Sequence, residues 1–362
     1  MDLSGINTVG GGGFADPPVR PWLDVEGKPI NAHGGGLLFH GGRAYWYGEC
    51  RPEGPASLNA RIGVAVYVSD DLVHWENGGV CLPVSEDPDH PMAPGCKIER
   101  PKVLFNAHTG QFVMWWHHDL KGRGHASALA GVAVSDSPVG PFRLHRVQRA
   151  NLGFWPLNAL PEQKVAMVSE ATRCSKFGGG PGEGADAHNV LARDYPVGQM
   201  VRDMTLFQDD DGTAYHIFAS EDNGTIHMAE LTPDFLDHSG RYIRAFEGRW
   251  MEAPCVFKRN GSFGFLASGC TSWRPNAARS GGAAAMFGPW TEWENPCRGV
   301  NPENGVGPEL TFGGQSTCVF QIPGEDRYYA MFDLWNPEDL HESRYLWLPL
   351  RWEGDRFFIE FA

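Results

Sequence analysis

One short pattern recurs five times along this chain of 362 residues. In each copy a polar residue leads into an apolar run that ends in Phe, and a turn then leads into a second, aromatic-rich run. The five copies are His33–Phe39, Glu99–Phe105, Asp203–Phe207, Glu252–Phe257 and Gln315–Phe320. Repetition of one strand–turn–strand unit predicts a repeat architecture in which each unit packs on its neighbours.

Each copy continues in the same way. Turn residues such as Asp209–Gly212 separate the first two runs, which is a hairpin signal. A third apolar run follows, as at Ile62–Ser69 and Ala130–Ser135, and then a turn into a fourth. This composition is typical of a propeller blade. The sequence therefore predicts an all-β, five-bladed β-propeller with its active site in the central pocket. Residues 1–362 are expected to form this single domain, with no appended carbohydrate-binding module.

The interval between the second and third copies is longer than the others. The surplus lies at about residues 151–198 and contains the glycine-rich run Gly178–Gly184. We expect an insertion before the third blade, and a long loop in a compact fold is often functional or else a variable surface segment.

The amino-acid composition excludes some classes of binding partner. The formal net charge of −14 argues against nucleic acid and anionic membrane surfaces, which need a basic patch. No apolar stretch approaches the ~18 residues that span a bilayer. Met1–Pro18 lacks the features of a signal peptide, so the protein is expected to be intracellular or a trimmed secreted protein.

Cys255 and Cys318 lie in apolar runs and are predicted to be small buried residues. Zinc is not expected, and a disulfide stays open.

The polar residue that opens each copy precedes the innermost strand of a predicted blade. Innermost strands begin at the rim of the central pocket, so we expect these five side chains to meet there. Carboxylates in such a pocket are the groups that hydrolyse glycosides. Tryptophan faces can stack on sugars or pack between blades. The candidates are Trp46, Trp115, Trp116, Trp273 and Trp335.

The motifs of this chain, taken in order, resemble glycoside hydrolase family 43, and more narrowly its exo-β-1,3-galactanase branch. The matching stretches are Asn31–Gly36, Tyr45–Glu49, Ile98–Val103, Arg202–Phe207, Asp209–Gly212, Glu252–Pro254, Ser268–Trp273, Gln315–Thr317 and Ser343–Pro349. The resemblance implies an inverting, exo-acting hydrolase that releases galactose from β-1,3-galactan. Inversion requires acid and base groups ~6.5–9.5 Å apart.

The resemblance also implies roles for individual residues. Glu252 is the general acid, and Asp203 raises its pKa and orients it. The usual base at the head of the first blade is missing, since Ala32-His33-Gly34 stands there. In the galactanase branch a Gln is thought to act as base through its imidic acid form, with a Glu beside it. Gln315 is therefore the base or a water-positioning group, and Glu99 is the alternative base. The residues expected to bind substrate are His33, Glu49, Trp116, Trp273 and Arg344.

Two segments depart from that branch. The stretch Asp119–His125 lacks a Tyr that often contacts the sugar, and the insertion at 151–198 is unusual; both are predicted near the pocket rim. An α-L-arabinofuranosidase, a β-xylosidase or an inactive sugar-binding propeller remain alternatives. No cofactor is expected. A structural calcium on the axis stays open, although Asp209–Gly212 fits a hairpin turn better.

Overall fold

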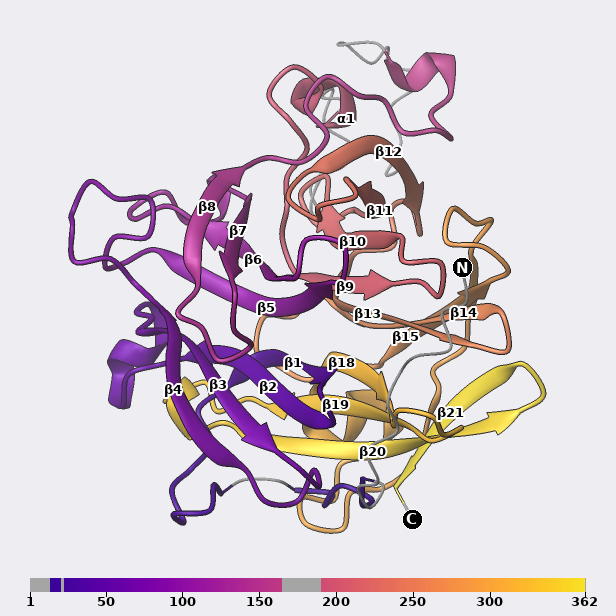
Figure 1. Cartoon of the computed structure of the whole chain (residues 1–362). Helices are drawn as coiled ribbons and strands as arrows, with labels where there is room; N and C mark the ends of the chain where they lie inside the picture. The colour runs from indigo at the N-terminus through magenta and orange to yellow at the C-terminus, as the bar shows by residue number, and fades with distance from the viewer. Residues whose placement is uncertain (1–13, 21–22, 165–189, 362) are drawn as a thin grey trace, which may run out of the picture.

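The computed structural model describes residues 14–20, 23–164 and 190–361, which form an almost all-β molecule (Figure 1). Five sheets surround one centre, and each contains the four consecutive strands of one repeat. The predicted five-bladed β-propeller is therefore confirmed. The strands of the first two blades are β1 (His33–His40), β2 (Arg43–Cys50), β3 (Gly63–Ser69), β4 (Glu76–Pro83), β5 (Lys97–Asn106), β6 (Gln111–Asp119), β7 (Leu129–Ser135) and β8 (Arg143–Gln148).

The remaining blades repeat this order, and the fifth has an additional outer strand, β17, parallel to β21. Their strands are β9 (Met204–Gln208), β10 (Ala214–Ser220), β11 (Thr225–Leu231), β12 (His238–Ala245), β13 (Met251–Arg259), β14 (Ser262–Gly269), β15 (Arg279–Ala283), β16 (Thr291–Trp293), β17 (Cys297–Gly299), β18 (Gln315–Gln321), β19 (Tyr328–Leu334), β20 (Arg344–Glu353) and β21 (Arg356–Phe361).

The apolar runs that open the five copies are the first strands of the blades, namely β1, β5, β9, β13 and β18. These strands contact one another in a closed ring at the centre of the molecule. These runs form strands because their apolar and aromatic side chains suit a pleated, partly buried surface. The ring brings the residues at the strand starts to one end of the propeller axis.

The hydrophobic core is divided among the seams between blades. Neighbouring blades pack around separate clusters, such as the one that joins blades one and two and the one that joins blades one and five. Trp46, Trp75 and Trp347 lie in the latter, with ring centroids 5.0 to 6.0 Å apart. Each blade is thus held mainly by its two neighbours, as the repeat predicts.

The N-terminal segment contributes to ring closure between blades one and five. Val19 accepts a hydrogen bond from the backbone of Trp347 at 2.8 Å. Asp16 pairs with Arg327 at 2.5 Å and accepts a hydrogen bond from Tyr329. The first 13 residues lie outside the described part of the chain. Within the described residues, no helix combines the length and apolar character needed to cross a membrane.

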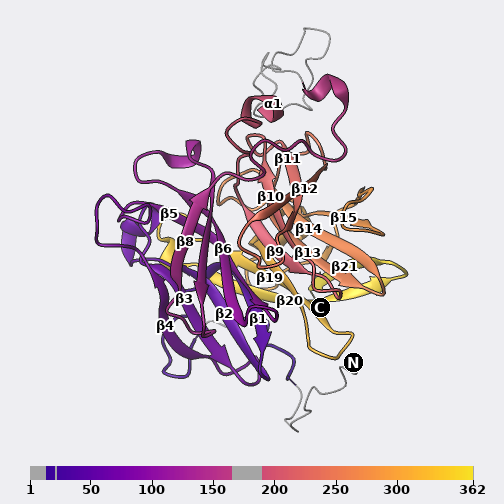
Figure 2. The same ribbon diagram turned by 45° about the horizontal axis from the view of Figure 1, so that its top comes forward.

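The chain between β8 and β9 contains the segment expected as an insertion, and the glycine-rich run 178–184 lies outside the described residues. The described parts, 151–164 and 190–198, include the short helix α1 (Val190–Asp194) beside the third blade (Figure 2). The 3-10 turn Pro161–Lys164 precedes the gap.

The seven cysteines in the described ranges are free thiols. Cys255 is buried, as expected, whereas Cys318 is only partly buried.

Candidate active site

A polar pocket opens at the end of the axis where the first strands begin. It contains about 650 Å³ of space, part of it open to solvent. Acidic and basic groups dominate its wall, and two tryptophans add apolar faces. The lining residues are Glu49, Arg51, Lys97, Glu99, Arg100, His125, Asp203, Glu252, Ser272, Trp273, Gln315 and Trp335. Four of the five strand-opening residues therefore converge.

Glu252 is the carboxyl group whose environment most opposes ionisation. Burial, together with the negative charge of Asp203, raises the pKa of Glu252 to about 8, against the opposing charges of Arg100 and Arg202. Its Oε1 accepts a hydrogen bond from Asn223 Nδ2 at 2.8 Å. Asp203 Oδ2 accepts a hydrogen bond from the backbone N–H of Ala253 at 3.0 Å. Because Ala253 directly follows Glu252, this bond ties the two acidic residues together across blades three and four.

Arg100 links three blades at the pocket wall. Its Nη2 lies 3.0 Å from Asp203 Oδ2 and donates to Gln315 Oε1 at 2.6 Å, while Nη1 donates to the Ser316 carbonyl at 3.1 Å. Although burial opposes its charge, Asp203 and other neighbouring carboxylates raise the pKa of Arg100. The guanidinium therefore stays charged and fixes the position of Gln315.

Gln315 has its amide orientation determined by its partners. Its Oε1 accepts from Arg100 and, at 2.8 Å, from Trp335 Nε1, and its Nε2 donates to Ser268 Oγ at 2.9 Å. Arginine and the indole N–H can only donate. The imidic acid form would place a proton on Oε1, opposite two donors with no acceptor. This arrangement favours the ordinary amide, whose second N–H can bind water.

Glu99 is held ionised by cations. Its Oε1 accepts from Arg61 at 2.9 Å and its Oε2 lies 3.2 Å from His117 Nδ1. Although burial opposes ionisation, His117 and Arg61 hold the pKa of Glu99 well below its ordinary value. Asp119, 3.5 Å from the other ring nitrogen of His117, acts with Glu99 against burial to raise the pKa of His117 to about 9. Glu99 is thus a carboxylate beside an imidazolium.

Glu49 also lines the pocket, as expected, but is engaged on every side. Its Oε2 lies 2.5 Å from Arg51 and 3.2 Å from Arg61, and its Oε1 accepts from the backbone N–H of Arg100 at 3.2 Å. The side chains of Arg51 and Arg61 are both buried. Glu49 therefore fixes the positions of Arg51 and of the Arg100 backbone at the pocket wall.

Local backbone geometry aims the strand-opening side chains. Gly34, Arg100 and Ala253, which follow His33, Glu99 and Glu252, have φ of +58°, +56° and +54°. The pairing register shifts at the same three places. Such bulges turn a side chain away from the regular pleat. At Gly34 a Cβ would lie 2.5 Å from Glu49 Oε1, so no larger residue fits there without movement.

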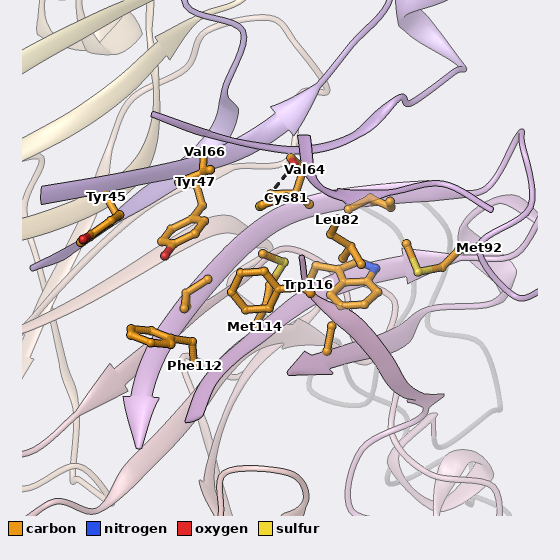
Figure 3. Packing of buried hydrophobic residues seen from close by; sticks show 14 of the residues in the cluster. Tyr45, Tyr47, Val64, Val66, Cys81, Leu82, Met92, Phe112, Met114 and Trp116 are labelled. Carbon is orange, nitrogen blue, oxygen red and sulfur yellow. Dashed lines mark hydrogen bonds between the residues drawn. The ribbon is translucent and has the colours of Figure 1, made fainter. Parts of the chain in front are cut away.

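The expectation that Trp116 contacts substrate is wrong. This residue is fully buried in the seam between blades one and two, beside Leu82 and Met114 (Figure 3). Its Nε1 donates to His118 at 3.1 Å. Trp46 and Trp115 are buried in other seams, whereas Trp273 and Trp335 lie in the pocket wall. The bulky rings of the inward-facing strand positions fill the core, and only those on loops reach the pocket.

His33 and Arg344 also lie elsewhere than expected. His33 is fully buried, with its ring 5.4 Å from Tyr345 and 6.0 Å from Trp335, so Trp335 reaches the pocket and His33 lies behind it. Arg344 is one-third exposed and pairs with Glu342 at 2.7 Å, away from the pocket wall. Its charge is already neutralised by this neighbour in the chain.

Several residues of the site escaped sequence reasoning. Arg51, Arg100 and Lys97 reach the pocket, and Asn223 reaches Glu252 from the turn between β10 and β11. His125 also lines the pocket, as expected for the stretch Asp119–His125. Arg100 directly follows Glu99 in the Glu-Arg-Pro motif, so its position in the sequence could have indicated that it lies near the pocket. Asn223 had none, because it lies 29 positions from its partner in sequence.

In the described part of the chain, Glu99, His117 and His125 offer ligand atoms within 4.8 Å of one another. Two nitrogens and one oxygen do not suit calcium, which takes six to eight oxygens. Arg61 and Lys97 also place positive charge beside this group. These charges oppose a cation, and the three side chains are better described as an ion-pair network.

Comparison with known proteins gives independent information. A family model described as Glycosyl hydrolases family 43 matches residues 185–330. A solved GH43 β-1,3-galactosidase, determined with galactodeoxynojirimycin, is 43% identical, with a TM-score of 0.85; the match covers 96% of this chain and 99% of that chain. No curated protein matches.

Two further solved structures are similar. An exo-β-1,3-galactanase from Clostridium thermocellum is 32% identical with a TM-score of 0.71, covering 95% of this chain and 64% of that one. The exo-β-1,3-galactanase from Phanerochaete chrysosporium, solved with galactose, is 27% identical with a TM-score of 0.71, covering 95% and 66%.

The geometry and the comparisons agree. Glu252 has a raised pKa and lies near Asp203 in a polar pocket with two tryptophans in its wall. A carboxyl group of this kind can protonate the departing glycosidic oxygen. A relative 43% identical over nearly its whole length has the same five-bladed architecture. The chain therefore belongs to glycoside hydrolase family 43.

Proposed function

We propose that this enzyme is an exo-acting β-1,3-galactosidase that releases galactose from the ends of β-1,3-galactan chains with inversion. The observation that carries the proposal is Glu252, whose pKa of about 8 keeps it protonated near neutral pH beside Asp203. The sugar specificity rests on relatives whose names give β-1,3-galactosidase or exo-β-1,3-galactanase activity. A variant of the Phanerochaete chrysosporium exo-β-1,3-galactanase was solved with β-1,3-galactotriose.

Glu252 would act as general acid. Its proton moves to the glycosidic oxygen as the bond to the anomeric carbon breaks, and the sugar develops oxocarbenium character. Asp203 supports this role because its charge disfavours the ionised form of Glu252. Arg100 Nη2 lies 3.0 Å from Asp203 Oδ2 and holds that carboxyl group in place beside the acid.

Glu99 and Gln315 would together activate and position the attacking water molecule. The free N–H of Gln315 donates to the water oxygen, and Glu99 accepts the proton as water attacks. A carboxylate has about four acceptor sites, so Glu99 keeps capacity beyond its bonds to Arg61 and His117. The donors on Gln315 Oε1 argue against its acting as the base itself.

The direct test is hydrolysis of β-1,3-galactobiose by the purified full chain, alongside 4-nitrophenyl galactosides, arabinofuranosides and xylosides. We expect galactose release, with the α-anomer formed first by NMR. Glu252→Gln should lower turnover of the disaccharide by about 10²–10⁴-fold and affect 2,4-dinitrophenyl galactoside much less, since that leaving group needs no proton. Galactose binding without turnover would identify a sugar-binding propeller, and preferred cleavage of arabinofuranosides or xylosides would favour those activities.

No cofactor is needed for this chemistry. Turnover should persist after dialysis against EDTA, and loss of turnover with recovery on adding calcium would overturn this part of the proposal.

A further inference from the structure

The turn that joins β10 to β11 has an unusual backbone. Glu221, Asp222 and Asn223 all have positive φ, of 52°, 56° and 71°. Consecutive left-handed residues other than glycine are uncommon and persist only where their surroundings hold them. The turn places Asn223 Nδ2 at 2.8 Å from Glu252 Oε1, on the next blade.

A buried ion pair anchors the start of this turn. Glu221 is fully buried, and its two oxygens accept from Arg244 Nε and Nη2 at 2.6 and 2.7 Å. His227 Nε2 lies 2.8 Å from Glu221 Oε1, and Thr225 donates to Oε2 at 3.1 Å. Bidentate pairing of this kind fixes geometry as well as charge.

The segment before the third blade contacts Arg244, which anchors this turn, and also contacts the turn itself. Asn158 brackets the backbone of Arg244, donating to its carbonyl at 2.8 Å and accepting from its N–H at 3.0 Å. Arg193, in α1, lies 3.3 Å from Asp222 Oδ2. Both views of the molecule place α1 beside the third blade, near β11 and β12 (Figures 1 and 2).

We propose that Asn223 is a positioning residue for the general acid, and that Asn158 and Arg193 of the 151–198 segment brace the turn that carries it. This inference rests on the proposed function and assigns Asn158 and Arg193, in the described parts of that segment, a role in acid catalysis.

The chemical reason lies in the two oxygens of Glu252. When Oε1 accepts the Asn223 N–H, the transferable proton is carried on Oε2. The hydrogen bond also stops rotation of the carboxyl group, so the proton faces one direction. Misplacement of a catalytic group by about 1 Å costs on the order of 10²-fold in rate. The proton transfer itself is unchanged: it leaves Glu252 for the glycosidic oxygen.

Asn223→Gly tests the proposal without straining the turn, because glycine adopts positive φ freely. We expect kcat for β-1,3-galactobiose to fall by about 10²-fold, with a much smaller change for 2,4-dinitrophenyl galactoside. Asn223→Asp keeps the size of the side chain, removes the N–H donor and adds a negative charge beside Glu252, so it should show the same selectivity and also move the alkaline limb of the pH profile to higher pH. Asn260→Gly is the matched control, since Asn260 also has positive φ (51°) in an exposed hairpin turn of blade four.

Arg193→Ala tests the brace. We expect a loss of about two- to fivefold on the disaccharide, as for a partly exposed ion pair, and none on the activated galactoside. Arg241→Ala, which breaks the exposed pair with Glu230 at 2.7 Å on the same blade, should change neither. Unchanged disaccharide turnover in Arg193→Ala would remove Arg193 from the proposal.

Equal losses on both substrates, or no loss, in the Asn223 variants would overturn the positioning role. If the wild-type enzyme cleaves neither galactoside, the proposed function fails instead, and the two failures are distinguishable.

Discussion

At the scale of single residues, the pocket separates carboxyl groups by their surroundings. Glu252 is partly buried, accepts one hydrogen bond and has a negative neighbour, and its pKa rises to about 8. Glu99 is also enclosed but lies against His117 and Arg61, so its pKa falls well below the ordinary value. One group therefore holds a proton at neutral pH and the other lacks one, which is the division that an acid and a base require.

The pH dependence of kcat/KM should report Glu252. A general acid acts in its protonated form, so activity on β-1,3-galactobiose should be retained below pH about 8 and fall about tenfold per pH unit above it. Asp203→Asn removes the charge that raises this pKa and should move the alkaline limb to lower pH. The limb should be absent for 2,4-dinitrophenyl galactoside; finding it there would assign it to another group.

Azide can distinguish the roles of Glu99 and Gln315. Azide attacks without losing a proton, so it should restore activity to Glu99→Ala on an activated galactoside and yield α-galactosyl azide. Without azide, Glu99→Ala should lose about 10²–10⁴-fold in turnover. Gln315→Ala, whose defect is placement of water, should recover less. Rescue of Gln315→Ala alone would reverse the assignment, and melting curves of both variants control for folding.

At the scale of elements, the first residues of the innermost strands position the side chains of the site. Register shifts at β1, β5 and β13 coincide with left-handed residues directly after the strand-opening side chain. The same backbone irregularity does not always direct the side chain into the pocket. In blades two and four it presents Glu99 and Glu252 to the pocket, whereas in blade one it leaves His33 behind Trp335. Equivalent position in a repeat therefore does not ensure equivalent exposure.

At the scale of the whole molecule, stability lies in the seams. The seam between blades one and five closes the ring, and it is built from large rings such as those of Trp46, Trp75, Phe320 and Trp347. Phe14 of the N-terminal segment packs against this cluster. Opening this seam would separate the two ends of the propeller and displace the residues of blade five that face the pocket.

Trp347→Ala should lower the free energy of unfolding by about 3–5 kcal/mol, because it leaves a large cavity in a buried cluster. Trp352→Ala, in the same strand but partly exposed, is the control and should cost less. Urea unfolding followed by tryptophan fluorescence and circular dichroism measures both. Equal losses in the two variants would contradict a special role for this seam.

Much of the fold was predictable because it is repetitive. Each copy has the same order of apolar runs and turns, so the five blades and their first strands follow from local patterning alone. The convergence of Glu99, Asp203, Glu252 and Gln315 was predictable for the same reason, since a closed ring of repeats brings equivalent positions together.

The sequence by itself thus determined the propeller, the family and which polar side chains open each blade. Tertiary structure decided which of these reach solvent and in what charge state. Trp116 is core because two blades close over it, and Asn223 belongs with Glu252 because a strained turn from one blade meets the next. Exposure and pKa depend on what packs around a group, and that packing is contributed by residues distant in the chain.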